Sequence, residues 1–153
     1  MTKILIRPAK YDELPRIKFI TKLAYKIPYK AGALVTKPHE SIEEDEKFKN
    51  KRISILVAHI EGKIVGAVRY RFDKPDNLYF FKLSVLKTYR NLGTGAALIG
   101  MLKKIAKKKG CKKITFDCAK EKRLDEYYKK LGFRIDRIEE KTNHHAVYMS
   151  KSI

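Results

Sequence analysis

Apolar residues fall along the chain in two spacings, one typical of strands and one typical of helices. Short runs that are apolar at the centre or alternate with polar residues predict seven strands, at residues 3–7, 53–59, 63–72, 78–86, 114–118, 134–138 and 146–150. Helical spacing and capping residues predict four helices. The first is capped by Asp12 and ended by Pro28, the second is opened by Ser41 with Glu44, and the others cover about 93–109 and 122–131.

The connections between these elements predict how the strands pair. Glu61 with Gly62, and the four residues 74–77, are turns short enough to join antiparallel neighbours. The strand at 78–86, the helix after it and the strand at 114–118 form a β-α-β unit, whose two strands run parallel. We therefore expect one α/β (α+β) domain over residues 1–153, with a mostly antiparallel sheet of about seven strands, one parallel pair and about four flanking helices.

Composition narrows the classes of function. The chain has 153 residues and a formal net charge of +19, a field that attracts polyanions. Residues 69–72 interleave two arginines with two aromatic residues, but alternation in a strand sends the arginines to one face and the rings to the other. The lysines fall mostly on outer helix faces, and no nucleic-acid-binding signature is present. Nucleic acid stays a minor alternative.

The chain also shows no membrane or secretion signal. No window reaches the ~18 consecutive apolar residues that a spanning helix needs, and the three apolar residues before Arg7 and Pro8 are too few for a secretion signal. We therefore expect a cytoplasmic protein that is not associated with a membrane. His144 and His145 are adjacent and would point to opposite faces of a strand, so we expect no metal site.

One segment carries a pattern with chemical meaning, because it joins a strand end to a basic connection and to two glycines in the first turn of a helix. A first helical turn offers unpaired N–H groups and partial positive charge, and glycines let a pyrophosphate approach the backbone. We expect the segment to bind a phosphorylated cofactor. Its proposed binding residues are Leu83, Ser84, Val85, Arg90, Asn91, Leu92, Gly93, Thr94, Gly95 and Ala96.

Two other phosphate-binding motifs fit this segment less well. A dinucleotide-binding turn needs a third small residue where Leu98 stands, and its glycines follow the strand almost directly. Asp117 does lie near the position at which a dinucleotide-binding motif has its ribose-binding acid. This single match does not support that motif against the two differences. A nucleoside-triphosphate loop needs Gly followed by Lys and then Ser or Thr, a sequence absent from the segment.

The segment resembles the coenzyme-A signature of the GNAT superfamily of N-acetyltransferases. Arg90, Gly93 and Gly95 follow the strand end at that family's spacing, and Tyr128 to Phe133 resembles its Tyr-x-x-x-Gly-Phe element. The resemblance covers essentially the whole chain. It implies a GNAT-like fold, acetyl-CoA as cosubstrate and an amine acceptor.

The same resemblance implies roles for individual residues. The parallel strands would splay and admit the pantetheine arm, with backbone groups of Leu83 and Val85 pairing with it and N–H groups of residues 92–96 holding the pyrophosphate. Tyr128 would be the general acid that reprotonates the thiolate, and Asp117 is the nearest acid for a general base. Glu121 stands where the family often has Asn, a departure that indicates a shortened loop.

The acceptor and the oligomeric state stay open, a homodimer included. The acidic run at residues 40–46 has two interpretations: favourable helix-terminus and ion-pair chemistry, or a patch that draws a cationic amine. The leading function is an N-acetyltransferase that transfers the acetyl group directly to a primary amine of a small molecule or a protein. The rival function is a non-catalytic acyl-CoA-binding module of the same fold.

Overall fold

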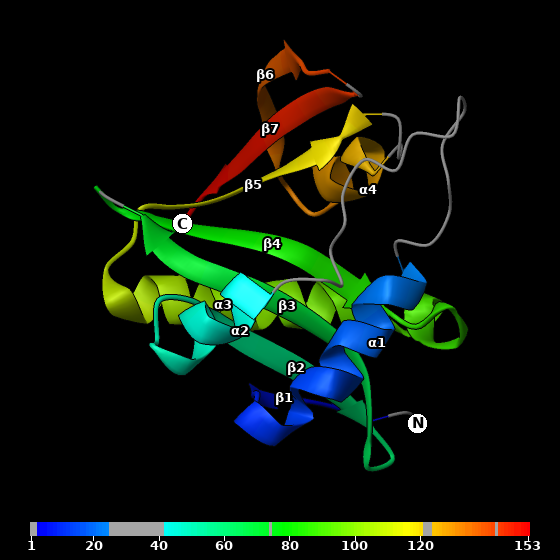
Figure 1. Cartoon of the computed structure of the whole chain (residues 1–153). Helices are drawn as coiled ribbons and strands as arrows, with labels where there is room; N and C mark the ends of the chain where they lie inside the picture. Colours follow the sequence, from blue (N-terminus) through cyan, green and yellow to red (C-terminus); the bar gives the residue numbers. More distant parts are fainter. Residues whose placement is uncertain (1–2, 25–41, 74, 121–123, 143) are drawn as a thin grey trace.

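The fold is a seven-stranded mixed sheet with helices on both faces (Figure 1). The computed structural model describes residues 3–24, 42–73, 75–120, 124–142 and 144–153. The elements, in chain order, are β1 Ile4–Pro8, the 3-10 helix η1 Tyr11–Glu13, α1 Leu14–Ala24, α2 Ile42–Lys49, β2 Ser54–Ile60, β3 Lys63–Asp73, β4 Asn77–Val85, the 3-10 helix η3 Lys87–Leu92, α3 Thr94–Lys109, β5 Lys113–Ala119, α4 Asp125–Lys130, β6 Arg134–Glu140 and β7 His145–Ser152.

The strand order confirms the predicted topology. Neighbours follow the order β1-β2-β3-β4-β5-β7-β6. The pair β4–β5 is parallel, and the other neighbouring pairs are antiparallel. The helix α3 connects the two parallel strands, as the β-α-β pattern predicts.

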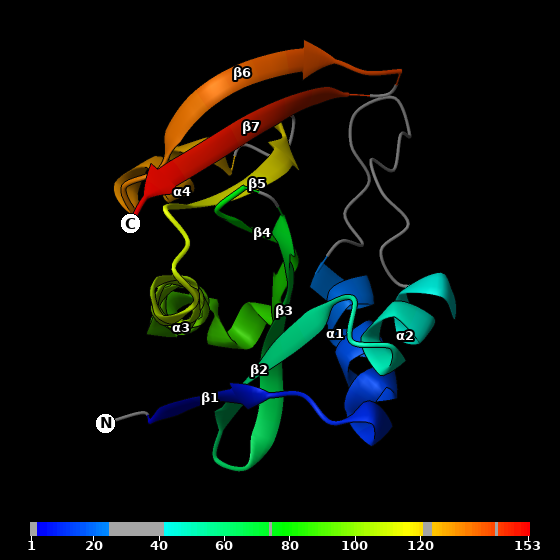
Figure 2. The same cartoon turned by 90° about the vertical axis from the view of Figure 1, so that its left-hand side faces the viewer.

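Each face of the sheet has its own hydrophobic core. Leu98, Leu102 and Phe80 belong to the larger core, under α3 and α4, while Ile17 and Val57 belong to the smaller one, under α1. Figure 2 shows α1 and α2 on one side of the sheet and α3 on the other. Arg69 and Tyr70 of β3 point to opposite faces, as strand alternation predicts: the ring packs on the larger core, and the guanidinium contacts Thr21 of α1.

The ends of α3 and the C-terminal end of α4 agree with the predicted ones to within about one residue, but two helices begin differently: α1, and α4, which begins at Asp125 and not at about residue 122. Gly110 ends α3 in a left-handed conformation, as expected of a C-terminal glycine. Asp12, predicted as the N-cap of the first helix, instead lies inside η1, and α1 begins at Leu14. The predicted end at Pro28 and the capping residue Ser41 lie outside the described residues.

Glu13 ties η1 to β1, and its ionisation should affect stability. Its carboxylate accepts hydrogen bonds from the Arg7 guanidinium (2.8 Å) and from the backbone N–H of Lys10 (2.8 Å). The Arg7 bond lowers the pKa of the Glu13 carboxyl to about 2. A carboxyl with a lowered pKa stabilises the folded state above its ordinary pKa, and this contribution is lost as the pH falls toward the folded-state value.

We therefore expect Glu13→Gln to lower the melting temperature at pH 7 by about 2 °C, because the pair is partly exposed. The difference from the parent should shrink between about pH 4.5 and pH 2, where the parent carboxyl itself becomes neutral. Thermal melts across this pH range test it. The neighbouring, exposed Asp12→Asn is the control, and a difference for Glu13→Gln that is independent of pH would contradict the ion-pair account.

Candidate active site

The parallel strands β4 and β5 pair only at their beginnings and then separate. Three positions are paired, with Asn77, Leu78 and Tyr79 opposite residues 113–115. Beyond them the two strands diverge, as Figure 1 shows. Leu83, Ser84 and Val85 lie in the diverging part of β4, so the splay that the family resemblance implies is present.

A β-bulge shifts the register of β4 just before these residues. Ala67 is opposite Ser84 while Arg69 is opposite Phe81, and Lys82 has the left-handed φ of +51°. After the bulge, the N–H of Leu86 bonds to the carbonyl of Val65 in β3. Because alternate residues of a strand point their backbone groups to opposite edges, Val85 presents its N–H and C=O toward β5.

The connection from β4 to α3 is held by two side-chain bonds to the backbone. Arg90 donates its Nε to the carbonyl of Val85 (3.0 Å), and buried Thr94 donates its hydroxyl to the carbonyl of Tyr89 (3.0 Å). Gly93 adopts the left-handed φ of +83° at the N-cap of α3. These contacts bring the guanidinium of Arg90 to the end of β4, beside the first turn of α3.

Tyr128 lies at the point where the strands separate. Phe80 and Phe116 are the first residues after the last paired position of β4 and β5. The ring of Tyr128 packs on both, with centroid distances of 6.2 and 4.1 Å, and on Phe133 at 5.9 Å. Tyr128 is only 5% exposed, so α4 holds this side chain against the apex of the opening on the α3 side.

Tyr127 lies beside the glycine-rich turn, a placement that no pattern in the sequence indicates. A Cβ on Gly95 would lie 2.9 Å from the hydroxyl of Tyr127, which places this hydroxyl against the first turn of α3. The side chain is 40% exposed, and burial raises the pKa of its hydroxyl. α4 therefore touches both the apex of the opening and the glycine-rich turn.

Asp117 faces the other side of the sheet from Tyr128. Its neighbour Phe116 packs on Tyr128, and alternation along β5 turns Asp117 to the opposite face. There it accepts a hydrogen bond from the hydroxyl of Tyr79 (2.5 Å), whose ring lies 4.4 Å from the guanidinium carbon of Arg71. Burial and the bond to Asp117 raise the pKa of the Tyr79 hydroxyl. The structure thus places the two proposed catalytic residues on opposite faces of the splayed strands.

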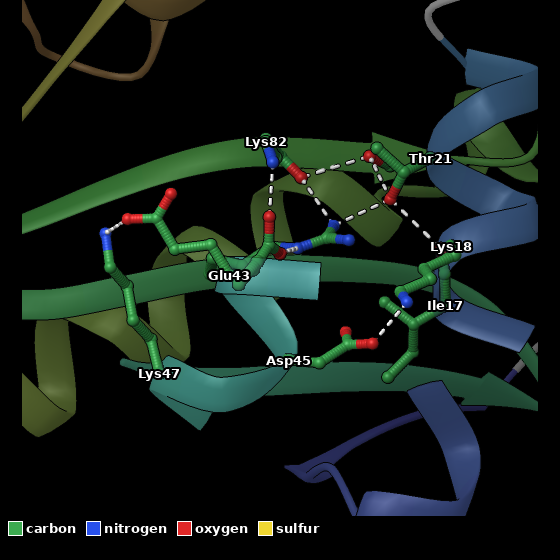
Figure 3. A network of polar contacts seen from close by, with 10 residues as sticks. Ile17, Lys18, Thr21, Glu43, Asp45, Lys47 and Lys82 are labelled. Atoms are coloured by element: carbon green, nitrogen blue, oxygen red, sulfur yellow. Dashed lines mark hydrogen bonds and ion pairs between the residues drawn. The ribbon is translucent and has the colours of Figure 1, made fainter. Parts of the chain in front are cut away.

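The acidic run on α2 is engaged in ion pairs within the protein. Glu43 pairs with Lys47 of the same helix (3.2 Å), and Asp45 pairs with Lys18 of α1. Glu44 is partly buried against β3 and β4, where it contacts two cations (Figure 3). These contacts favour the interpretation of the run as helix and ion-pair chemistry.

The described residues also bear on metal binding and on membrane spanning. Among the residues whose placement is described, no three His, Cys, Asp or Glu side chains gather where a metal ion could be held. In the same part of the chain, no helix has the length and apolar character needed to cross a membrane.

Comparison with known proteins places the chain in a family. The profile described as "Acetyltransferase (GNAT) family" matches residues 19–133. The probable N-acetyltransferase camello of Xenopus tropicalis is 31% identical over 99 residues, which are 63% of this chain and 45% of that protein. The chain thus matches less than half the length of this curated relative.

Solved structures agree with the fold. The PaiA N-acetyltransferase of Thermoplasma acidophilum, solved in complex with coenzyme A, has a TM-score of 0.78 at 18% identity, over 99% of both chains. The ribosomal-protein-S18-alanine N-acetyltransferase of Escherichia coli has a TM-score of 0.76 at 19% identity, over 99% of this chain and 94% of that one. With the profile match, the splayed parallel pair and the glycine-rich turn, the predicted family is confirmed: the chain belongs to the GNAT family of acetyltransferases.

Proposed function

We propose that this protein is an acetyl-CoA-dependent N-acetyltransferase that moves the acetyl group directly to a primary amine on a small molecule or a protein. One observation carries the proposal. The strands β4 and β5 separate beside the first turn of α3, and Tyr128 packs at the apex of the opening. The glycine-rich first turn of α3, the diverging edge of β4 and the phenol of Tyr128 therefore lie near one another. This arrangement supports a site in which they bind a pyrophosphate, a pantetheine arm with its thioester, and supply a proton.

The cofactor would follow β4 into the opening. The pyrophosphate would bind the N–H groups of residues 92–96, with Arg90 adding positive charge. The pantetheine amides would pair with backbone groups of Leu83 and Val85, as an added strand does. The coenzyme-A complex of the Thermoplasma relative supports a cofactor of this kind in this fold.

Direct transfer needs one acid and one base. The amine nitrogen attacks the thioester carbonyl carbon, the C–S bond breaks, and the thiolate takes a proton from the hydroxyl of Tyr128. A phenol suits this role because its ordinary pKa of about 10 keeps it protonated at pH 7. The excess proton of the attacking amine passes to Asp117, directly or through water, on the opposite face of the strands.

The opposed positions of Tyr128 and Asp117 fit such a reaction. A thioester held in the opening would meet the phenol from the α3 side and the amine from the other side. The hydroxyl of Tyr79 fixes the carboxylate of Asp117 at 2.5 Å. On the same face the guanidinium of Arg71 lies over the stacked rings of Tyr79 and Phe81, at 4.4 and 5.9 Å from their centroids, so the protein's own cation fills this cation–π position.

We expect Asp117→Asn to lower kcat/KM for the acceptor about tenfold at pH 7 and to leave coenzyme A binding unchanged. The loss is modest because water can replace a base that acts on a solvent-accessible amine. Steady-state kinetics with the best acceptor test it. Asp136→Asn is the control, because Asp136 also lies in the sheet and pairs with exposed Arg134 (3.2 Å). Equal kinetics for both variants would exclude Asp117 as the base.

A screen of amines with acetyl-CoA tests the function itself. Polyamines, amino sugars, aryl alkyl amines and peptides with free N-termini would be incubated with the protein, and thiol release would be recorded. An acceptor-dependent release of coenzyme A supports the enzyme. Coenzyme A binding without turnover on any acceptor would favour the non-catalytic module, and DNA binding that is steeply salt-dependent and insensitive to coenzyme A would favour a nucleic-acid-binding domain.

A further inference from the structure

Arg69 is a buried arginine that joins three elements on the α1–α2 face of the sheet. It is 1% exposed. Its Nε donates to Glu44 of α2 (2.7 Å), and its Nη1 donates to the hydroxyl of Thr21 in α1 (2.7 Å) and to the carbonyl of Lys82 in β4 (3.3 Å). A buried guanidinium is tolerated only where its charge and N–H groups are matched, so these contacts fix its position.

Glu44 bridges two cations. One carboxylate oxygen accepts from Arg69, and the other accepts from the Lys82 ammonium (Figure 3). Burial alone would raise the pKa of Glu44, but the charges of Arg69 and Lys82 outweigh burial and lower it. Glu44 is therefore a carboxylate at neutral pH. Its contacts hold α2 against β3 and against β4 at the bulge.

Lys82 is held by the same network at both its side chain and its backbone. Its φ of +51° is unfavourable for a residue with a Cβ. Its ammonium contacts Glu44, and its carbonyl accepts from Arg69 (3.3 Å) and from the hydroxyl of Ser84 (3.0 Å). The network thus compensates for a strained conformation at the bulge, which lies between Phe81 and Ser84.

We propose that Glu44 is a positioning residue for the pantetheine arm of the cofactor. Through Arg69 and Lys82 it stabilises the bulge of β4, which aligns the backbone of Leu83 and Val85 toward the opening between β4 and β5. Glu44 itself does not touch the cofactor. The inference rests on the proposed function, in which that backbone pairs with pantetheine, and it assigns to α2 a role in cofactor affinity.

Glu44→Gln is the direct test, because glutamine keeps the size but can accept from only one of the two cations. Two ligands separate an effect on the pantetheine arm from an effect on the whole site. They are coenzyme A and adenosine 3′,5′-bisphosphate, which lacks pantetheine. By calorimetry at a temperature where circular dichroism shows the variants folded, we expect Glu44→Gln to weaken coenzyme A binding about tenfold, the worth of one or two backbone hydrogen bonds. Binding of adenosine 3′,5′-bisphosphate should not change.

Asp45→Asn is the matched control, since it removes the neighbouring carboxylate of α2, whose pair with Lys18 reaches α1 and not β4. It should bind both ligands as the parent does. Equal weakening of both ligands in Glu44→Gln would overturn the inference, because it would show a general loosening of the site. Unchanged coenzyme A binding would overturn it as well.

If Glu44→Gln does not fold, substitutions at Lys82 make the same test. Both Lys82→Gly and Lys82→Val remove the ammonium, but glycine adopts a positive φ freely while a β-branched residue resists it. Lys82→Val should therefore lose about tenfold more coenzyme A affinity than Lys82→Gly, and equal affinities would overturn the inference. Failure of the parent to bind coenzyme A would overturn the proposed function together with this inference.

Discussion

Replacing Tyr128 by phenylalanine is expected to slow acetyl transfer about 100-fold or more, the scale of a lost general acid, without weakening coenzyme A binding. Phenylalanine keeps the ring that packs on Phe80 and Phe116 and removes the hydroxyl that would protonate the thiolate. The thiolate must then leave with a proton from water, which raises the barrier of this step alone. Thiol release at saturating acetyl-CoA and acceptor measures the effect as a fall in kcat.

Tyr11→Phe is the control for this experiment. It also removes a tyrosine hydroxyl, from an exposed residue of η1, and should leave both kcat and coenzyme A affinity unchanged. A fully active Tyr128→Phe enzyme would show that water or another group protonates the thiolate. Tyr128 would then serve only in packing.

Gly95→Leu is expected to abolish the stabilisation of the protein by coenzyme A. Gly95 lies in the first turn of α3, and a Cβ there would already lie 2.9 Å from the hydroxyl of Tyr127. Tyr127 is a flexible, partly exposed side chain and can move aside, so the fold should survive. The leucine side chain would then occupy the space through which a pyrophosphate reaches the N–H groups of the turn. Thermal melts with and without coenzyme A measure the loss.

Gly100→Leu is the matched control on the same helix. A Cβ at Gly100 meets no atom within 4 Å, and leucine has a higher helix propensity than glycine. This variant should be at least as stable as the parent and should keep its full response to coenzyme A. A normal response in Gly95→Leu would contradict the placement of the pyrophosphate at this turn.

The order and type of the elements followed from local pattern. The apolar residues Leu98 and Leu102 at helical spacing, with Gly110 after them, predicted α3 correctly. The two short turns predicted β2–β3–β4 as an antiparallel meander. These features could be predicted because each depends on residues close together in sequence. The predicted start of the first helix at Asp12 was wrong, because Glu13 and not Asp12 makes the contacts with Arg7 and with the backbone of Lys10.

The contacts of the site could not be predicted in the same way. Glu44 meets Lys82, and Tyr79 meets Asp117, across 38 residues of sequence in each case. Such pairs depend on strand register and on the bulge at Lys82, and a lysine gives no local signal for a positive φ. Alternation correctly assigned Arg69 to the face opposite Tyr70, but only the position of α2 explains why this arginine is buried.

The family resemblance supplied what pattern alone could not. The glycine-rich segment indicated a phosphorylated cofactor. Together with the element at Tyr128 to Phe133 it indicated the GNAT family, which the profile match confirmed. The splay of β4 from β5, implied by that resemblance, is present after three paired positions. The roles of Tyr128 and Asp117 stay predictions, and their opposite faces make them separately testable.

The melting temperature of the parent protein with and without coenzyme A tests the central claim most directly, because it needs no knowledge of the acceptor. A ligand at 100 times its dissociation constant stabilises the folded state by about 2.7 kcal/mol. For a domain of this size we expect the melting temperature to rise by about 5–10 °C. No rise at millimolar coenzyme A would contradict the assignment of the opening between β4 and β5 as a cofactor site.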